Sequence, residues 1–201
     1  AEARDVALAI ELFTEGSLNT FAKPTNVDTS SRILCYDIRD LGKQLQPVGM
    51  LVVLDSVFNR IIRNRKLGKS TWVYIDEIYL LFQHEYSANF LFTLWKRVRK
   101  YGACCTGLTQ NVDDLLQSHT ARTMLANSEF LVMLNQAATD RAELANLLNI
   151  SDNQLSYITN VDSGRGLIKC GSAIVPFMNS FPKNRLYQLM TTRPSETMAA
   201  A

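Results

Sequence analysis

The sequence predicts an α/β fold, in which a mostly parallel β-sheet is covered by helices on both faces. The first observation is that short apolar runs typical of strands alternate along the chain with segments whose apolar residues recur at helical spacing. Strands joined through crossover helices form parallel sheets of this kind. The second observation is size, since 201 residues with 47% apolar content can bury one sizeable core. We therefore predict one domain over residues 1–201.

The first third of the chain predicts two helices and a strand. Helices are expected at Asp5–Thr14 and at Val48–Asn64, where the apolar residues follow helical spacing. Between them, Arg32–Ile38 is predicted to be a strand entered from a polar turn. The basic loop Arg65–Ser70 then leads into a further strand at Thr71–Ile75.

The middle of the chain continues the alternation. A second long helix is predicted at Tyr86–Tyr101, and Gly102 ends it. A short apolar strand, Ala103–Leu108, follows directly. After it the pattern predicts two short helices and another strand: Val112–Gln117, Ala121–Ala126 and Phe130–Leu134.

The last third predicts a helix at Ala138–Leu148 and a second helix that begins at Ser151, where Gln154 three residues later completes a capping box. A C-terminal β-hairpin is predicted from Arg165–Cys170 and Ala173–Phe177, because Gly171-Ser172 between them forms a tight turn. Residues 197–201 are expected to form a disordered tail.

Composition narrows the class of protein. Lys and Arg number 21 and Asp and Glu 19, so the net charge does not indicate a nucleic-acid partner. There is no signal-peptide pattern, and no apolar run reaches the length needed to span a bilayer. The cysteines lack metal-ligand spacing and lie in apolar segments, so we expect buried, reduced thiols in a cytosolic protein. They are Cys35, Cys104, Cys105 and Cys170.

Adjacent carboxylates, Asp76 and Glu77, follow the predicted strand Thr71–Ile75. Ligands of open α/β sheets bind beyond the carboxyl ends of the strands, so carboxylates placed there face a nucleotide. Asp76 would hold Mg²⁺, usually through water, and Glu77 could act as general base. The alternative is a strand that simply leaves the sheet through a solvated turn, and these two residues alone leave both interpretations open.

A glutamine and a basic cluster stand on either side of the next predicted strand. Gln110 follows its carboxyl end, where an amide could contact a γ-phosphate or orient water, or merely cap the next helix. Arg97 and Arg99 belong to a cluster of four cations in five residues that ends the preceding helix. Such a cluster stabilises the negative C-terminal end of the helix dipole. It could also present an arginine to the nucleotide of a neighbouring subunit.

Taken in order, several segments resemble the C-terminal part of the VirB-type conjugation ATPases, the fourth VirB component, with the Gram-positive conjugative-element branch as the nearest group. These segments are TWVYIDEIYLLF, LWKRVRKYGACCTGLTQNVDDLL, MLANSEFLVMLNQAATDRAELANLLNI and GRGLIKCGSAIVPF with FPK. The resemblance runs from about Gly16 to Glu196.

This resemblance implies a RecA-like, three-layer domain related to the coupling-protein and FtsK/HerA pumps. It implies that Asp76 and Glu77 are the Walker B pair, that Gln110 is the strand-end glutamine, and that Arg97 or Arg99 is an arginine finger. It further implies ATP and Mg²⁺ as cofactors, other type IV secretion components as partners, and possible contact with DNA. The expected oligomer is a hexameric ring in the assembly, with a monomer as the alternative for the chain in isolation. The expected location is cytoplasmic, at the inner face of the membrane, with no transmembrane segment.

One family element is missing from the sequence, the Walker A loop G-x-x-x-x-G-K-[ST]. Gly68-Lys69-Ser70 resembles its end, but Arg63 stands where the first glycine belongs, and the segment enters a strand instead of opening a helix. We therefore expect the chain to be a fragment of a larger ATPase that binds nucleotide weakly by itself. The alternatives are a DNA-translocating pump of the same group and a non-catalytic interaction module.

Overall fold

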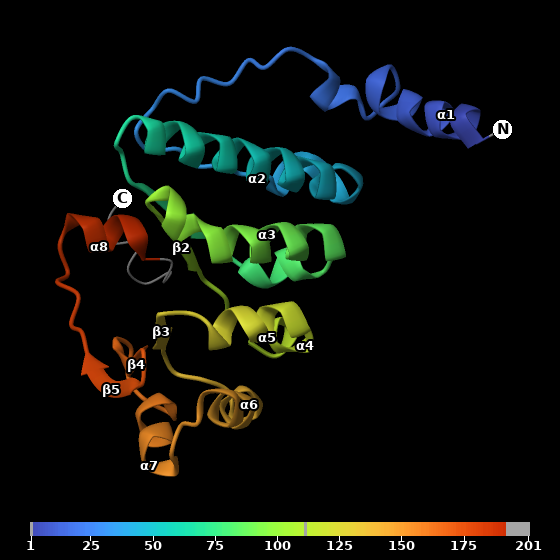
Figure 1. Cartoon of the computed structure of the whole chain (residues 1–201). Coiled ribbons are helices and arrows are strands. Elements are labelled where there is room, and N and C mark those ends of the chain that lie inside the picture. The colour runs from blue at the N-terminus through green and yellow to red at the C-terminus, as the bar shows by residue number, and fades with distance from the viewer. Residues whose placement is uncertain (1, 111, 192–201) are drawn as a thin grey trace. The chain divides into compact units, whose positions relative to one another are not determined.

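The computed structural model of the chain describes residues 2–110 and 112–191 (Figure 1). By its internal contacts the chain divides into two compact units. Unit 1 takes in the chain up to Thr71 together with Tyr101–Ala103, and unit 2 takes in Trp72–Lys100 and the chain from Cys104 onward. The predicted tail at 197–201 lies outside the described residues. Whether the units form one domain, as the sequence predicts, stays a prediction.

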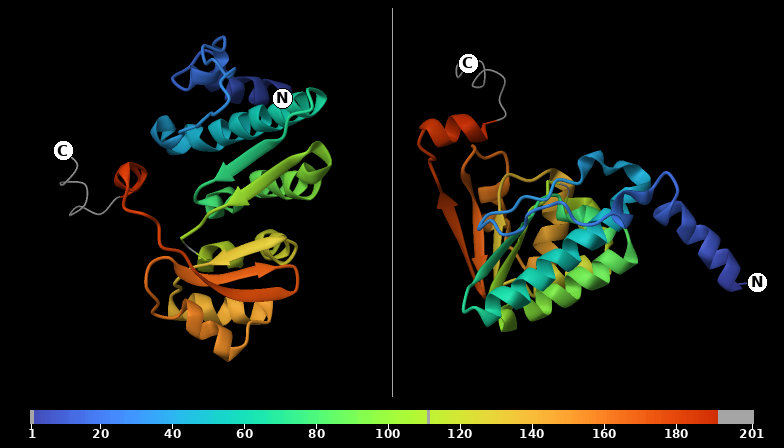
Figure 2. Two further views of the ribbon diagram at one scale, coloured as in Figure 1. Left: turned by 90° about the vertical axis from the view of Figure 1, so that its left-hand side faces the viewer. Right: turned by 90° about the horizontal axis from the view of Figure 1, so that it is seen from above.

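The strands form a parallel pair and an antiparallel sheet of three (Figure 2). The pair consists of β1 (Thr71–Ile75) and β2 (Ala103–Gly107). The second sheet has the order β3-β4-β5, with Phe130 opposite Cys170 and Arg165 opposite Met178. Its strands are β3 (Phe130–Met133), β4 (Arg165–Cys170) and β5 (Ala173–Met178). The predicted C-terminal hairpin is therefore confirmed, as are the strands at Thr71, Ala103 and Phe130.

The helices of unit 2 lie between these strands along the chain, except for α8, which follows the last of them. The sequence predicted most of them, although the last turn of the helix expected at Tyr86–Tyr101 is a 3₁₀ turn, and η3 and α8 were not predicted. In chain order they are η3 (Ile78–Phe82), α3 (Glu85–Arg97), η4 (Val98–Tyr101), α4 (Val112–Gln117), α5 (His119–Ala126), α6 (Ala138–Leu148), α7 (Asp152–Leu155), η5 (Ser156–Ile158) and α8 (Arg185–Met190). The capping box at Ser151 and Gln154 is present. It fixes the start of α7 beside the hairpin, where the Gln154 amide also reaches the Ile174 carbonyl.

The main core of unit 2 lies between helices α4 and α6 and the antiparallel sheet. Ile158 and Leu167 are fully buried in it. The other buried members of this cluster come from three elements and the segment after α6: Val112, Leu116, Met133, Leu144, Leu148 and Ile150. Burying such side chains stabilises a fold by about 1.5–3 kcal/mol each, so this core fixes the position of β3 and β4.

The helices α3, α5 and α6 lie on one face of the strands (Figure 2). On the opposite face large apolar side chains are exposed: Trp72 by 65%, Tyr74 by 66%, Phe130 by 66% and Val132 by 61%. Trp72, although it lies in a strand, is therefore exposed. The second helical layer that the sequence predicts is not supplied by the described residues of unit 2.

The cysteines differ from expectation in burial. Cys35, Cys104 and Cys170 are exposed, and Cys105 is half-buried. Cys104 is exposed because successive strand residues point to opposite faces, and its face is the one without helices. All four are free thiols, as predicted. Burial raises the pKa of the Cys105 thiol to about 12, so this side chain stays protonated at neutral pH.

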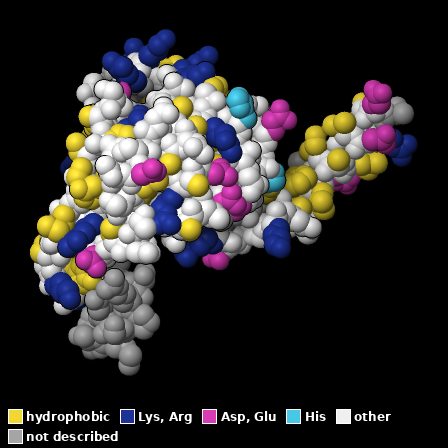
Figure 3. All heavy atoms as spheres, turned by 90° about the horizontal axis from the view of Figure 1, so that it is seen from below, with side chains coloured by type: hydrophobic (Ala, Val, Ile, Leu, Met, Phe, Trp, Pro, Cys, Tyr) yellow, Lys and Arg dark blue, Asp and Glu magenta, His cyan; other side chains and the backbone are white. Residues whose placement is uncertain are grey.

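Unit 1 is built from helices. They are α1 (Glu2–Thr14), η1 (Asn19–Ala22), η2 (Arg39–Leu41) and α2 (Gly42–Lys66). The two predicted helices are confirmed, and both are longer than expected. No residue of α1 is buried, and its hydrophobic side chains are visible on the surface in Figure 3. Arg63, Arg65 and Lys66 occupy the last turn of α2, where cations stabilise the helix dipole.

By length and composition, the helical stretch Arg39–Lys66 is able to cross a membrane. The core helix of a water-soluble protein meets the same criterion, so this feature is weak evidence for a membrane span. Five residues of α2 are buried within the structure. The absence of a membrane-spanning segment thus stays a prediction.

The strand predicted at Arg32–Ile38 does not form. Burial alternates along this segment as it would in a strand, but no other strand pairs with it in the described part of the chain. Side chains of α2 hold this segment and the residues just before it instead. Ser56 hydrogen-bonds the Tyr36 hydroxyl at 3.0 Å, and Arg60 donates to the main-chain carbonyl of Thr29.

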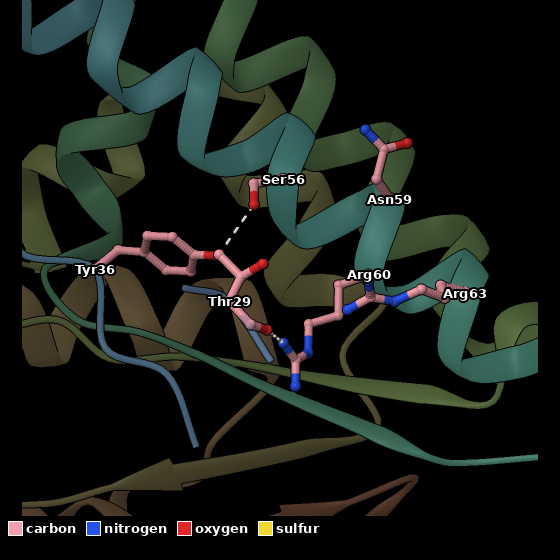
Figure 4. A pocket seen from close by; sticks show the side chains of 6 residues that line it. All are labelled: Thr29, Tyr36, Ser56, Asn59, Arg60 and Arg63. Atoms are coloured by element: carbon pink, nitrogen blue, oxygen red, sulfur yellow. Dashed lines mark hydrogen bonds between the residues drawn. The ribbon is translucent and has the colours of Figure 1, made fainter. Parts of the chain in front are cut away.

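A cavity of about 260 Å³ opens between this segment and α2 (Figure 4). Arg60 already donates hydrogen bonds to main-chain carbonyls there. The cavity is therefore better explained as a gap in the packing between α2 and this segment than as a binding site. It is lined by Thr29, Tyr36, Ser56, Asn59, Arg60 and Arg63.

Candidate active site at the carboxyl ends of β1 and β2

The carboxyl ends of β1 and β2 lie at the same edge. The Leu108 amide donates to the Ile75 carbonyl at 2.8 Å, while at the other end of the pair the Thr71 amide donates to the Gly102 carbonyl at 3.4 Å. Because both strands advance together between these two bonds, they run in parallel. Their polar ends, Asp76-Glu77 and Thr109-Gln110, are thereby brought to one edge, as the sequence predicts.

Glu77 is the centre of this edge. The main-chain amide of Gln110 donates to Glu77 Oε2 at 3.5 Å, and the Glu77 amide donates to Asp76 Oδ1 at 3.1 Å. Glu77 is half-buried, whereas Asp76 and Gln110 are exposed. The structure therefore brings together Asp76, Glu77 and Gln110, which come from segments 33 residues apart. The contact to Glu77 comes from the Gln110 main chain, so the Gln110 side chain is left available.

Glu77 adopts the left-handed backbone conformation, with φ 47° and ψ 50°. A residue with a Cβ is disfavoured there by about 1–2 kcal/mol. The conformation turns the chain sharply out of β1 into η3, and Ile78 becomes buried. Unusual backbone of this kind concentrates at functional sites, so it favours a functional interpretation of Glu77 over a plain solvated turn.

Substituting Glu77 by Gly is expected to leave the free energy of unfolding unchanged or to raise it by up to about 1 kcal/mol. The reason is that glycine adopts positive φ without a steric cost. Thermal unfolding of the 201-residue chain measures this. Asn89→Gly, on the exposed side of α3, is the control and should lower Tm. A clear loss of stability in Glu77→Gly would show that the carboxylate contacts outweigh the backbone strain.

Gly107 allows the close approach of the two strand ends. A Cβ at this position would lie 2.5 Å from Ile78 Cδ1, so any side chain would displace Ile78. Since Ile78 directly follows Glu77, Gly107 helps to set where the carboxylate lies. The sequence analysis missed this role, although a glycine within a strand often marks a close approach.

The donor set suits magnesium only in part. The carboxylate oxygens of Asp76 and Glu77 are the hard ligands that Mg²⁺ prefers. Among the described residues no group of three or more His, Cys, Asp or Glu side chains could hold a metal by itself. Mg²⁺ is usually held by one or two carboxylates together with phosphates and water, and one exposed aspartate at a strand end fits that arrangement.

Arg97 and Arg99 lie elsewhere. They end α3 and continue into η4, both are exposed, and they precede the start of β2. At about 3.3 Å per residue, the length of β2 separates them from the carboxylate edge by on the order of 15 Å. The structure therefore does not bring either arginine to Glu77 within one chain.

Gly68-Lys69-Ser70 forms a connector, as expected. Gly68 has φ 67° just beyond the end of α2, and Ser70 precedes β1. A phosphate-binding loop follows a strand and opens a helix, and this segment does the reverse. It cannot supply the missing Walker A loop.

Comparison with known proteins supports the same fold. The family model described as the TraG P-loop domain matches residues 25–167. Among solved structures, VirB4 of Thermoanaerobacter pseudethanolicus is similar with a TM-score of 0.78 and 24% sequence identity, over 90% of this chain and 50% of that one. The chain thus spans about half the length of that protein. No curated protein matches the chain. The predicted RecA-like α/β fold is confirmed by this structural likeness.

Proposed function

Because the chain belongs to the TraG P-loop domain family, we propose that it is part of an ATP-hydrolysing motor that energises a type IV secretion or conjugation system. Its membership and fold also confirm the resemblance to VirB-type conjugation ATPases. The observation that carries the proposal is the meeting of Glu77 and Gln110 at the shared carboxyl edge of two parallel strands, where α/β sheets bind their ligands.

Each residue of this edge has a role in the proposal. Asp76 would hold the Mg²⁺ that accompanies bound ATP, and when bound the metal would supply positive charge against the phosphates. Glu77 accepts a proton from the attacking water, and the Gln110 main-chain amide orients its carboxylate for that task. The Gln110 side chain, exposed beside it, contacts the γ-phosphate or the water.

The proposal concerns a longer protein, which we call the parent polypeptide, and residues 1–201 are one part of it. The phosphate cradle of main-chain amides and its lysine supply most contacts to a nucleotide. Residues 1–201 contain no G-x-x-x-x-G-K-[ST] segment, so we expect this chain alone to bind ATP weakly. Its partners in the proposal are further copies of itself in a ring and other secretion components at the inner face of the membrane.

DNA translocation by the same motor is the alternative. On the face drawn in Figure 3, cationic and anionic side chains are interspersed, whereas nucleic-acid binding rests on clustered cations. This pattern does not favour direct contact with DNA, and neither does the near-neutral composition. The third interpretation is a non-catalytic module that retains the geometry of an ATPase.

Nucleotide hydrolysis by two proteins tests the proposal. The parent polypeptide is expected to hydrolyse ATP in the presence of Mg²⁺, while the 201-residue chain shows no turnover above background. Titration with a fluorescent ATP analogue measures binding separately. A parent polypeptide that binds no nucleotide would favour the non-catalytic module. A salt-dependent gel shift on duplex DNA would favour the translocase.

A further inference from the structure

A buried serine connects η3 to α3. Ser87 lies in the first turn of α3, and it is the only polar residue that the described part of the chain buries, with 3% of its surface exposed. Its hydroxyl donates to the Leu81 carbonyl at 2.6 Å and to the His84 carbonyl at 3.0 Å. The His84 carbonyl also accepts the Ala88 amide at 3.0 Å, as in any helical turn. The bond to Leu81 is therefore the one by which Ser87 holds a different element, η3, on α3.

The turn that carries the carboxylates is held on its other side by the residue that follows β2. The Leu108 amide donates to the Ile75 carbonyl at 2.8 Å, and the Leu108 carbonyl accepts the Ile78 amide at 2.9 Å. Asp76 and Glu77 stand between these two bonds in the sequence. Their placement therefore depends on Leu108 on one side and on η3, which begins at Ile78, on the other.

The backbone of Glu77 needs this support. Its left-handed conformation, with φ 47°, is disfavoured for a residue with a Cβ and persists only where the surroundings fix it. Ile78 and Leu81 of η3 are buried, with 6% and 5% of their surfaces exposed. Burial of apolar side chains is non-directional, so it keeps η3 in the core without fixing its rotation. A hydrogen bond prefers a short distance and a nearly linear angle, so the bond from Ser87 adds that restraint.

The helix α3 is a firm support for this bond. Ala88, Leu91 and Leu94 are buried along it, with at most 6% of each surface exposed. The helix has 13 residues and ends at Arg97, so at roughly 1.5 Å per residue it is about 20 Å long. Together η3 and α3 form one packed body, with the proposed base at one end and a proposed arginine finger at the other.

We propose that Ser87 is a positioning residue for the hydrolysis of ATP. Its bond to Leu81 holds η3 on α3, and η3 in turn holds the Glu77 carboxylate where it meets the attacking water. Ser87 acts through Glu77 and is not a ligand of the nucleotide. This inference rests on the proposed function, since Glu77 is the base only in that function. The buried hydroxyl thereby contributes to the rate of the reaction as well as to the stability of the fold.

Turnover and ATP binding by the parent polypeptide test this role. Ser87→Ala removes the donor to the Leu81 carbonyl and lets η3 shift, so we expect turnover to fall by about 10- to 100-fold, as small misplacements of reacting groups do. The affinity for ATP should stay within about twofold, because the phosphate cradle supplies most contacts. Unchanged turnover, or a loss explained wholly by weaker ATP binding, would overturn the proposal.

Thr159→Val is the matched control. The Thr159 hydroxyl donates to the Leu155 carbonyl at 2.7 Å, and the residue is half-buried after η5. The substitution thus removes the same kind of bond from the same unit, outside η3 and α3. Its turnover should stay within about twofold of the unsubstituted protein, because sites without shared partners act independently. Ser87→Cys is a second variant, since a thiol fills nearly the same space and donates weakly, and it should show the same split between turnover and binding.

A double substitution shows whether Ser87 acts through Glu77. Once Glu77→Gln has removed the base, the placement of that side chain no longer matters. In that protein Ser87→Ala should therefore lower single-turnover hydrolysis by less than about twofold. A further fall by the same factor as in the unsubstituted protein would mean that Ser87 affects the rate by another route, and would overturn its role as a positioning residue.

Hydrogen exchange tests the hold on η3 without any turnover. In the nucleotide-free parent polypeptide, the Ile78 amide, which donates to the Leu108 carbonyl, should exchange at least about tenfold faster after Ser87→Ala. The Gln136 amide donates to the Ile158 carbonyl at 2.9 Å. It is the control, and its exchange should not change.

The outcomes separate this inference from the proposed function. Equal exchange of the Ile78 amide in both proteins would overturn the hold of Ser87 on η3, even if the parent hydrolyses ATP. Faster exchange in a parent polypeptide that does not hydrolyse ATP would overturn the motor function and leave that hold standing.

Discussion

Substituting Glu77 by Gln is expected to lower ATP hydrolysis by the parent polypeptide by about 10²–10⁴-fold, the usual contribution of a general base. The amide keeps nearly the same size and can still lie beside the Gln110 main chain, but it cannot take a proton from water. Nucleotide binding should be retained, because the phosphate cradle provides most of it. Steady-state turnover and a binding titration on the same preparation measure both quantities.

Glu85→Gln is the matched control. Glu85 begins α3 and is exposed, so the substitution removes one charge from the same unit without touching the carboxylate edge. We expect its turnover to stay within about twofold of the unsubstituted protein, because an exposed charge near a helix end contributes less than about 1 kcal/mol. Normal hydrolysis by the Glu77→Gln protein would remove Glu77 from the role of base.

Helix starts and tight turns were predictable from the sequence where neighbouring residues alone determine them. The capping box at Ser151 and the tight turn at Gly171-Ser172 need only neighbouring residues, and both formed as predicted. The segment Arg32–Ile38 failed for the opposite reason, because a strand needs a partner edge. Its alternating burial persists, but side chains of α2 take the place of a ladder.

The site was predictable in its residues but not in its geometry. Alternation of strands and helices was sufficient to place Asp76, Glu77 and Gln110 at one edge. The left-handed conformation of Glu77 was not predictable, because glutamate carries no preference for it. The exposure of Trp72 could not be foreseen either, since burial depends on which elements cover a face and not on the strand itself.

The separation of the arginines from the carboxylates has a direct consequence for the motor. Arg97 and Arg99 lie at the start of β2 and Glu77 beyond its end, so the proposed arginine finger would act on the site of a neighbouring subunit. Such a finger contributes about 10³–10⁵-fold to turnover by stabilising charge on the transferred phosphoryl group. Arg97→Ala combined with Arg99→Ala is therefore expected to reduce turnover by the assembled parent by that factor. Lys100→Ala, in the same cluster, should have little effect.

Mixing two inactive proteins distinguishes a finger that acts between subunits from one that acts within a subunit. The Glu77→Gln protein keeps its arginines, and the protein with both arginines replaced keeps its base. If the finger acts between subunits, a random ring of equal parts contains intact sites at about a quarter of its interfaces, so turnover should recover to about that fraction of the unsubstituted protein. A finger acting within its own subunit would give no recovery, because no single chain in the mixture carries both groups. Unchanged turnover in the protein with both arginines replaced would rule out the finger altogether.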